Sequence, residues 1–65
     1  MAQLSPRELE ILVLVCSDKS SREIAEELCI SAATVDTHRK ALLRKTGSKN
    51  KIGLVKFALR NRLIG

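Results

Sequence analysis

Five side chains between Ala33 and Arg44 have the types and the spacing that suit contact with DNA. At about 100° per residue in a helix, the following residues fall on one side: Ala33, Asp36, Thr37, Lys40 and Arg44. Their hydroxyl and carboxylate groups could hydrogen-bond to base edges, and the Lys and Arg side chains could bind bases or phosphates. Small side chains at the start of this face allow close approach to a surface. Such a face is what a helix lying in the DNA major groove needs.

The helix that positions these side chains is predicted over residues 32–46. Ser31 can cap its start, and Gly47 can take the left-handed conformation that ends a helix. The other side of the helix carries Val35, His38, Leu42 and Thr46, with Arg39 and Leu43 at its edge. We expect that side to pack against the rest of the chain, with His38 in the core or at a phosphate rather than in catalysis.

Three further helices are predicted, over residues 6–16, 21–28 and 51–61. The first two begin with the same device, a capping serine followed three residues later by a glutamate, as Ser5 with Glu8 and Ser20 with Glu23. Asn50 is the expected cap of the last helix, with Ser48 as the alternative. The residues expected to face inward are Leu9, Leu12, Val13 and Cys16, then Ile24, Ala25 and Leu28, then Leu54, Phe57 and Ala58. We therefore predict an all-α fold, a compact four-helix domain, with residues 1–65 forming a single domain.

The last helix carries a second apolar stripe, formed by Ile52, Val55 and Leu59. A domain of this size has no evident use for two apolar faces on its terminal helix. We interpret the stripe as a homodimer interface. The alternative is that Val55 belongs to the edge of the core and the other two residues are merely exposed.

Charge is distributed unevenly along the chain. Residues 1–36 carry three basic and seven acidic side chains, a balance of −4, whereas residues 37–65 carry nine basic side chains and no acid, a balance of +9. Together they give the net charge of +5. This asymmetry favours a polyanion facing the second half of the chain, although a solvated basic face would show the same pattern.

The remaining residues give little sign of catalysis, metal binding or membrane insertion. Cys16 and Cys29 lie in apolar contexts and are expected to be buried thiols, because a zinc site needs about four ligands and His38 is the only other strong candidate. Paired acids, a nucleophile with its base and a Gly-rich phosphate loop are all absent from the sequence, so neither an enzyme nor a cofactor is predicted. Phe57 is the only aromatic residue, which disfavours RNA or single-strand binding. A membrane span and a signal peptide are also missing from the sequence, which favours a soluble cytoplasmic protein.

Several ordered motifs resemble the DNA-binding domain of the LuxR/FixJ/NarL family of bacterial transcription regulators. They are LSPRELEIL from Leu4, SREIAEELCIS from Ser21, TVDTHRKALLRKTG from Thr34, and the closing Ala58 and Leu63-Ile64. The resemblance implies a four-helix domain whose second and third helices form a helix-turn-helix and whose fourth helix makes the dimer contact. It also implies that Asp36, Thr37 and Lys40 reach base edges and nearby phosphates. The phosphate-binding residues that it implies are Ser20, Ser21, Ser31, Thr34, Lys49 and Lys51, and we add Arg39 to them.

The chain departs from the family pattern at three places. Asp36 stands where many members have Lys, and an acid there could accept a hydrogen bond from cytosine N4 or orient Arg39 or Lys40. The usual glycine between the first two helices is replaced around Ser17-Asp18, and the usual glycine before the final Leu-Ile is Arg62. These replacements put the loop geometry and the end of the last helix in question.

The function hypothesis is sequence-specific binding of double-stranded DNA in bacterial transcription regulation, as a dimer on paired half-sites. The chain would be the output domain of a two-component response regulator. Candidate partners are a second copy, RNA polymerase, and a covalently linked receiver or ligand-binding domain, because the start at Met1 fits either a small stand-alone regulator or an excised C-terminal domain. Two alternatives are a promoter-binding region like that of a sigma factor and a protein-interaction module that docks a receiver domain or an anti-activator.

Overall fold

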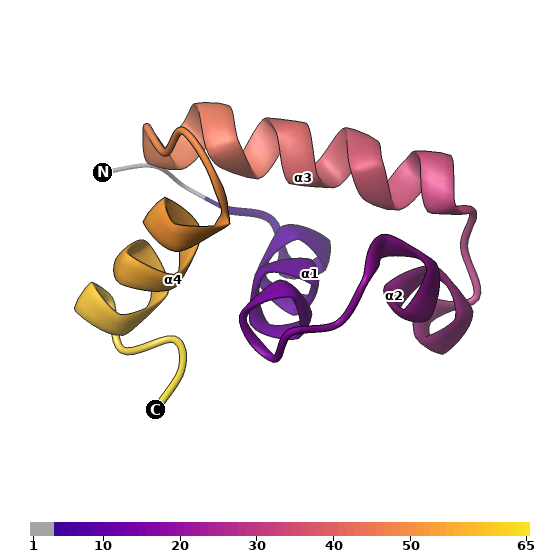
Figure 1. The fold of residues 1–65 in the computed structure, drawn as a ribbon, viewed down its shortest axis with the longest axis horizontal. Coiled ribbons are helices and arrows are strands. Elements are labelled where there is room, and N and C mark those ends of the chain that lie inside the picture. The colour runs from indigo at the N-terminus through magenta and orange to yellow at the C-terminus, as the bar shows by residue number, and fades with distance from the viewer. Residues whose placement is uncertain (1–3) are drawn as a thin grey trace.

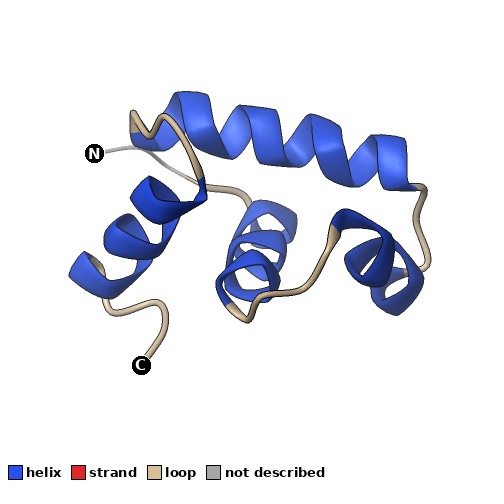
Figure 2. Cartoon of the chain, in the orientation of Figure 1, coloured by secondary structure: helices blue, strands red, loops and turns tan. Residues whose placement is uncertain are grey.

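The structure is a computed structural model that describes residues 4–65, so the predicted domain boundary at Met1 lies outside the described residues. These residues form four α-helices and no strand: α1 (Pro6–Cys16), α2 (Ser21–Leu28), α3 (Ala32–Thr46) and α4 (Lys51–Arg60). α3 runs along one edge of the molecule, and the other three helices lie beneath it (Figure 1). Short loops join the helices (Figure 2). The predicted all-α, four-helix fold is confirmed.

The predicted capping devices explain where the helices begin. The Ser5 amide donates to Glu8 Oε1 at 2.8 Å, and the Glu8 amide donates to Ser5 Oγ at 3.2 Å. Ser20 and Glu23 repeat this reciprocal pair at 2.9 and 3.1 Å. The hydrogen bonds from Ser20 hold the pKa of the Glu23 carboxyl below its usual range. Both capping boxes are therefore present as the sequence predicts.

α3 and α4 are also bounded by local residues. Ser31 Oγ accepts from the Thr34 amide at 3.1 Å, and Gly47 ends α3 in the left-handed conformation with φ 68°. At the start of α4 the Gly53 amide donates to Asn50 Oδ1 at 3.2 Å, so Asn50 is the cap and Ser48 is not. α4 ends at Arg60, one residue before the predicted end.

The core is built from apolar residues of all four helices: Ile11, Leu12, Val15, Ile24, Ala25, Val35, Leu42, Leu54 and Ala58. The predicted inward stripe of α1 is wrong in part, because Val13 is 37% exposed whereas Ile11 and Val15 are fully buried. Because α1 contacts all three other helices, its buried side is centred on Ile11 rather than on the predicted stripe.

The expectation of two buried thiols is also wrong. Cys16 is half-buried, but Cys29 is exposed. Cys29 follows the end of α2 in the left-handed conformation with φ 58°. The Ile30 amide then donates back to the Ala25 carbonyl at 3.0 Å, and Ile30 packs against the core instead.

Two further residues adopt the left-handed conformation at the positions where the family resemblance leads one to expect glycine. Asp18, between α1 and α2, has φ 65°, and Arg62, after α4, has φ 56°. The chain therefore forms both turns without glycine. Asp18 is of a type that tolerates this conformation, whereas the conformation is strained for Arg62. Among the described residues, none of the helices is long and apolar enough to span a membrane.

Candidate nucleic-acid interface

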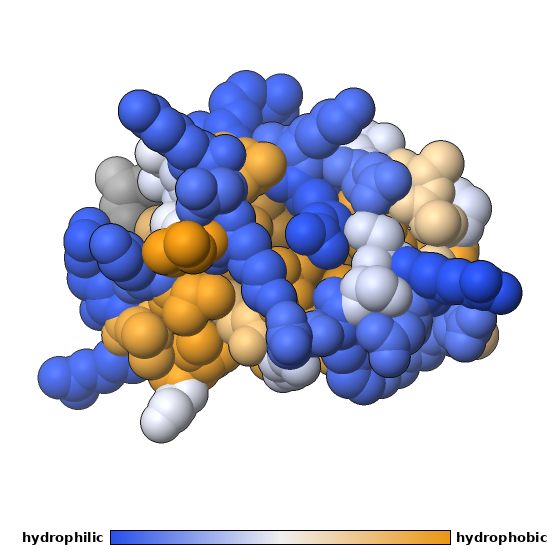
Figure 3. All heavy atoms as spheres, viewed as in Figure 1, coloured by the Kyte–Doolittle hydropathy of each residue, from blue (hydrophilic) through white to orange (hydrophobic). Residues whose placement is uncertain are grey.

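The face of α3 predicted to meet DNA is exposed along its length. Its five residues, Ala33, Asp36, Thr37, Lys40 and Arg44, are all exposed. Val35 and Leu42, on the opposite side of the same helix, are fully buried. Hydrophilic side chains cover much of the α3 edge in the view of Figure 3. The helix is thus anchored by one side and presents the other.

Thr37 presents a methyl group and oxygen lone pairs rather than a free donor. Its Oγ1 donates to the Ala33 carbonyl at 3.0 Å, one turn earlier in α3. A hydroxyl has a single hydrogen, so this bond leaves the oxygen free only to accept. Thr37 could therefore accept from a base amino group or contact a thymine methyl.

Asp36 and Arg39 are joined through a residue of α2. Ser21 Oγ donates to Asp36 Oδ1 at 2.7 Å, and Arg39 Nη1 donates to Ser21 Oγ at 3.3 Å. Asp36 is exposed, whereas Ser21 and Arg39 are half-buried. The structure therefore brings three of the predicted site residues together at the start of α2.

The hydroxyl groups of the other predicted phosphate-binding residues take part in helix caps. Ser20 Oγ and Ser31 Oγ accept from backbone amides of α2 and α3, and Ser31 Oγ lies 2.8 Å from Thr34 Oγ1. Ser20 still has its hydroxyl hydrogen to donate. The first amides of each helix add donors that suit an anion.

The two predicted lysines before and at the start of α4 differ in their surroundings. Lys49 is exposed in the α3–α4 loop. Lys51 is half-buried and forms an ion pair with Asp18 of the α1–α2 loop, which holds the pKa of the Asp18 carboxyl below its usual range. Lys51 therefore ties two loops together, and it could bind a phosphate only by sharing or leaving this ion pair.

The second apolar stripe of α4 lies mostly on the surface. Ile52 is 65% exposed and Leu59 is 54% exposed, whereas Val55 is half-buried. Apolar surface gathers over α4 at the lower left of Figure 3, apart from the α3 edge. The exposure of Ile52 and Leu59 fits both the dimer interpretation and the alternative, and Val55 is not among the half-buried apolar residues that pack against the core.

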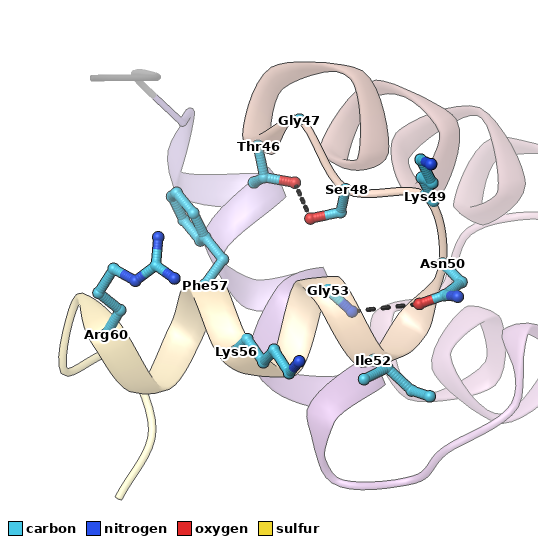
Figure 4. Close-up of a pocket in the computed structure, with 10 residues that line it drawn as sticks. All are labelled: Thr46, Gly47, Ser48, Lys49, Asn50, Ile52, Gly53, Lys56, Phe57 and Arg60. Atoms are coloured by element: carbon cyan, nitrogen blue, oxygen red, sulfur yellow. Dashed lines mark hydrogen bonds between the residues drawn. The ribbon is translucent and has the colours of Figure 1, made fainter.

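A shallow groove of about 480 Å³ lies between the α3–α4 loop and α4 (Figure 4). Thr46 and Ser48 face each other across the loop, with their hydroxyl oxygens 2.7 Å apart. Gly53 faces the same loop, and a Cβ atom there would lie 2.7 Å from Ser48 Cβ, so a side chain at this position would push the loop away. The groove could not be predicted from the sequence, because it forms only where the loop folds back on α4. It is lined by Thr46, Gly47, Ser48, Lys49, Asn50, Ile52, Gly53, Lys56, Phe57 and Arg60.

Comparisons with known proteins identify the family to which this chain belongs. The family described as "Bacterial regulatory proteins, luxR family" matches residues 2–58. The transcriptional regulatory protein MctR of Rhizobium johnstonii is 48% identical over 56 residues, which are 86% of this chain and 26% of that protein. The oxygen regulatory protein NreC of Staphylococcus aureus is 44% identical over 61 residues, which are 94% of this chain and 28% of that protein. The chain thus spans little more than a quarter of these relatives.

A solved structure shares the fold. It is the crystal structure of ChrA, a response regulator in a heme-sensing two-component system, with a TM-score of 0.88 and 39% sequence identity. The match covers 98% of this chain and 32% of the ChrA chain. The chain belongs to the LuxR family of bacterial regulatory proteins, and it is a helix-turn-helix domain for DNA binding in transcription regulation, not an enzyme.

Proposed function

We propose that α3 lies in the major groove of double-stranded DNA and reads base edges with Thr37, Lys40 and Arg44. The observation that carries this proposal is the division of α3 into a fully buried side, at Val35 and Leu42, and an exposed polar side. A recognition helix needs such an anchor because base contacts require a fixed depth and angle in the groove. Ala33 lies at the start of the exposed side and allows the backbone to approach the bases.

Phosphate contacts supply most of the affinity in this proposal. The starts of α2 and α3, where Ser20, Ser21, Ser31 and Thr34 lie, offer backbone amides and the hydroxyl hydrogen of Ser20. Positive charge comes from Arg39, Lys49 and Lys51. Two helix N-termini beside a basic helix suit the two sugar-phosphate backbones that flank a groove.

Dimerisation would proceed through Ile52, Val55 and Leu59 of α4. The support is the exposure of Ile52 and Leu59, which are large apolar side chains on a helix that already buries Leu54 and Ala58. A twofold dimer would place two copies of α3 on paired half-sites.

The whole protein would be a two-component response regulator with this domain as its output. The support is the match to the response regulator ChrA and the small share of each relative that this chain spans. A covalently linked receiver or ligand-binding domain and RNA polymerase are the further partners in this proposal.

Selection of binding sites from random duplex DNA, at two salt concentrations, tests the proposal. We expect a paired motif to be enriched at both, with weaker retention at the higher salt concentration. The Lys56→Ala variant removes one exposed charge from α4 and should select the same motif. Retention at low salt without any motif would show that the domain binds phosphate alone, which contradicts base reading by α3.

A further inference from the structure

The negative charge of Asp36, on the exposed face of α3, is by itself unfavourable for DNA binding. Asp36 is the only acidic residue in α3, and no acid follows it in the chain. A carboxylate on a surface that meets a polyanion weakens binding. If charge were its whole effect, removal of Asp36 would tighten DNA binding.

The hydrogen bonds around Asp36 indicate a different role. Ser21 has one hydroxyl hydrogen, and it donates that hydrogen to Asp36 Oδ1 at 2.7 Å. The lone pairs of Ser21 Oγ are thereby left to accept from Arg39 Nη1 at 3.3 Å. Without the carboxylate, the hydroxyl could rotate and present its hydrogen to the guanidinium instead.

The guanidinium is held at a place that suits an anion. Arg39 is half-buried at the edge of α3, and Ser21 is the first residue of α2, whose initial amides have no partner within the helix. A phosphate at this point could meet both the guanidinium and these amides. A guanidinium that is fixed before binding loses less conformational entropy when it binds.

We propose that Asp36 is a positioning residue, which acts through Ser21 to hold the Arg39 guanidinium at the start of α2 for a DNA phosphate. This inference rests on the proposed function. It assigns Asp36 to phosphate binding through another residue rather than to base reading. The acid thus has opposite effects on binding through its charge and through its hydrogen bond.

Two variants of Asp36 separate these effects, because Asp36→Asn and Asp36→Ala remove the same charge. Asn retains an oxygen that can accept from Ser21, whereas Ala does not. We expect Asp36→Asn to bind a random-sequence duplex about tenfold more tightly than Asp36→Ala, the effect of one hydrogen bond to a charged group. Ala is the better helix former, so a loss of helix stability would not explain weaker binding by the Ala variant.

The role of Arg39 is tested in the Arg39→Ala background. There the Asn and Ala variants of Asp36 should bind alike. In the natural background, Ser21→Ala should bind more weakly than Asp36→Ala, because it loses the hydrogen bond and keeps the carboxylate charge. Glu10→Gln and Glu10→Ala are matched controls, because Glu10 is exposed on α1 and its loss changes the net charge equally. Thermal unfolding of each variant shows whether it is folded.

Two results would overturn the role of Asp36. One is equal affinity of the Asn and Ala variants while Lys40→Ala weakens binding. The other is a difference between them confined to one base pair, which would make Asp36 a base reader. If Lys40→Ala also left binding unchanged, the proposed interface on α3 would be wrong as a whole.

Discussion

Lys45 Nζ, near the end of α3, donates to Glu8 Oε1, in the first turn of α1, at 2.9 Å. The Glu8 side chain is only 6% exposed, and the same oxygen accepts from the Ser5 amide. The hydrogen bond from Lys45, together with that from Ser5, lowers the pKa of Glu8 from 4.5 to about 2. One buried carboxylate therefore caps α1 and joins it to α3.

The contact between Glu8 and Lys45 should make the stability of the domain decrease at acidic pH. Because the pKa of Glu8 is lower in the folded state, its contribution is fully present above about pH 4.5 and is lost as the pH falls toward 2. We expect Glu8→Gln to reduce the free energy of unfolding by roughly 2 kcal/mol at pH 7 and to change it little at pH 2. Urea unfolding at a series of pH values measures both. Glu10→Gln, on the exposed side of α1, is the control, and an equal loss at both pH values would contradict the assignment.

A substitution of Lys40 tests the proposal that α3 reads base edges. We expect Lys40→Ala to weaken specific DNA binding by about 1–3 kcal/mol and to relax base preference at one position of the site. Affinity for a set of singly substituted operators, taken from the selection experiment, measures both effects. A uniform loss across all sequences would instead assign Lys40 to a phosphate.

Leu59 tests the proposed dimer. Leu59→Lys should place a charge in the apolar stripe of α4 and shift the domain to the monomer, with weaker binding to paired half-sites and unchanged helicity. Sedimentation equilibrium and circular dichroism measure these properties. Val13→Lys is the matched control because Val13 is also a large exposed apolar residue, but on α1. A Leu59→Lys variant that still binds as a dimer would refute the interface.

A substitution at Arg62 measures how much a left-handed turn without glycine reduces the free energy of unfolding. Arg62 is exposed with φ 56°, and the next amide, of Leu63, donates to the Ala58 carbonyl at 2.8 Å. We expect Arg62→Gly to raise the free energy of unfolding by up to about 1 kcal/mol. Arg60→Gly, at the end of α4, should have the opposite effect. Asp18 is the less clear test because its side chain also pairs with Lys51.

The helix boundaries could be predicted because capping is local. Ser5 with Glu8, Ser20 with Glu23, and Asn50 with Gly53 are each three residues apart, so the sequence already contains both partners. The exposed face of α3 could be predicted for a similar reason, since helical periodicity alone places Lys40 and Arg44 together.

Contacts between helices could not be predicted in the same way. The burial of Val15 in place of Val13 depends on where three other helices pack against α1. The bond from Ser21 to Asp36 spans fifteen residues and requires the angle between α2 and α3. Exposure of Cys29 follows from the left-handed end of α2, which the apolar neighbours of that residue did not reveal.

α1 and α3 each contact every other helix, whereas α2 and α4, as the structure describes them, do not contact each other. The proposed dimer surface and the start of α2 are therefore separated by at least one intervening helix. Free-energy effects of substitutions at distant sites without shared partners usually add. Changes at Leu59 and at Ser21 should thus combine additively within one domain, so dimer strength and phosphate contact could be altered independently in this fold.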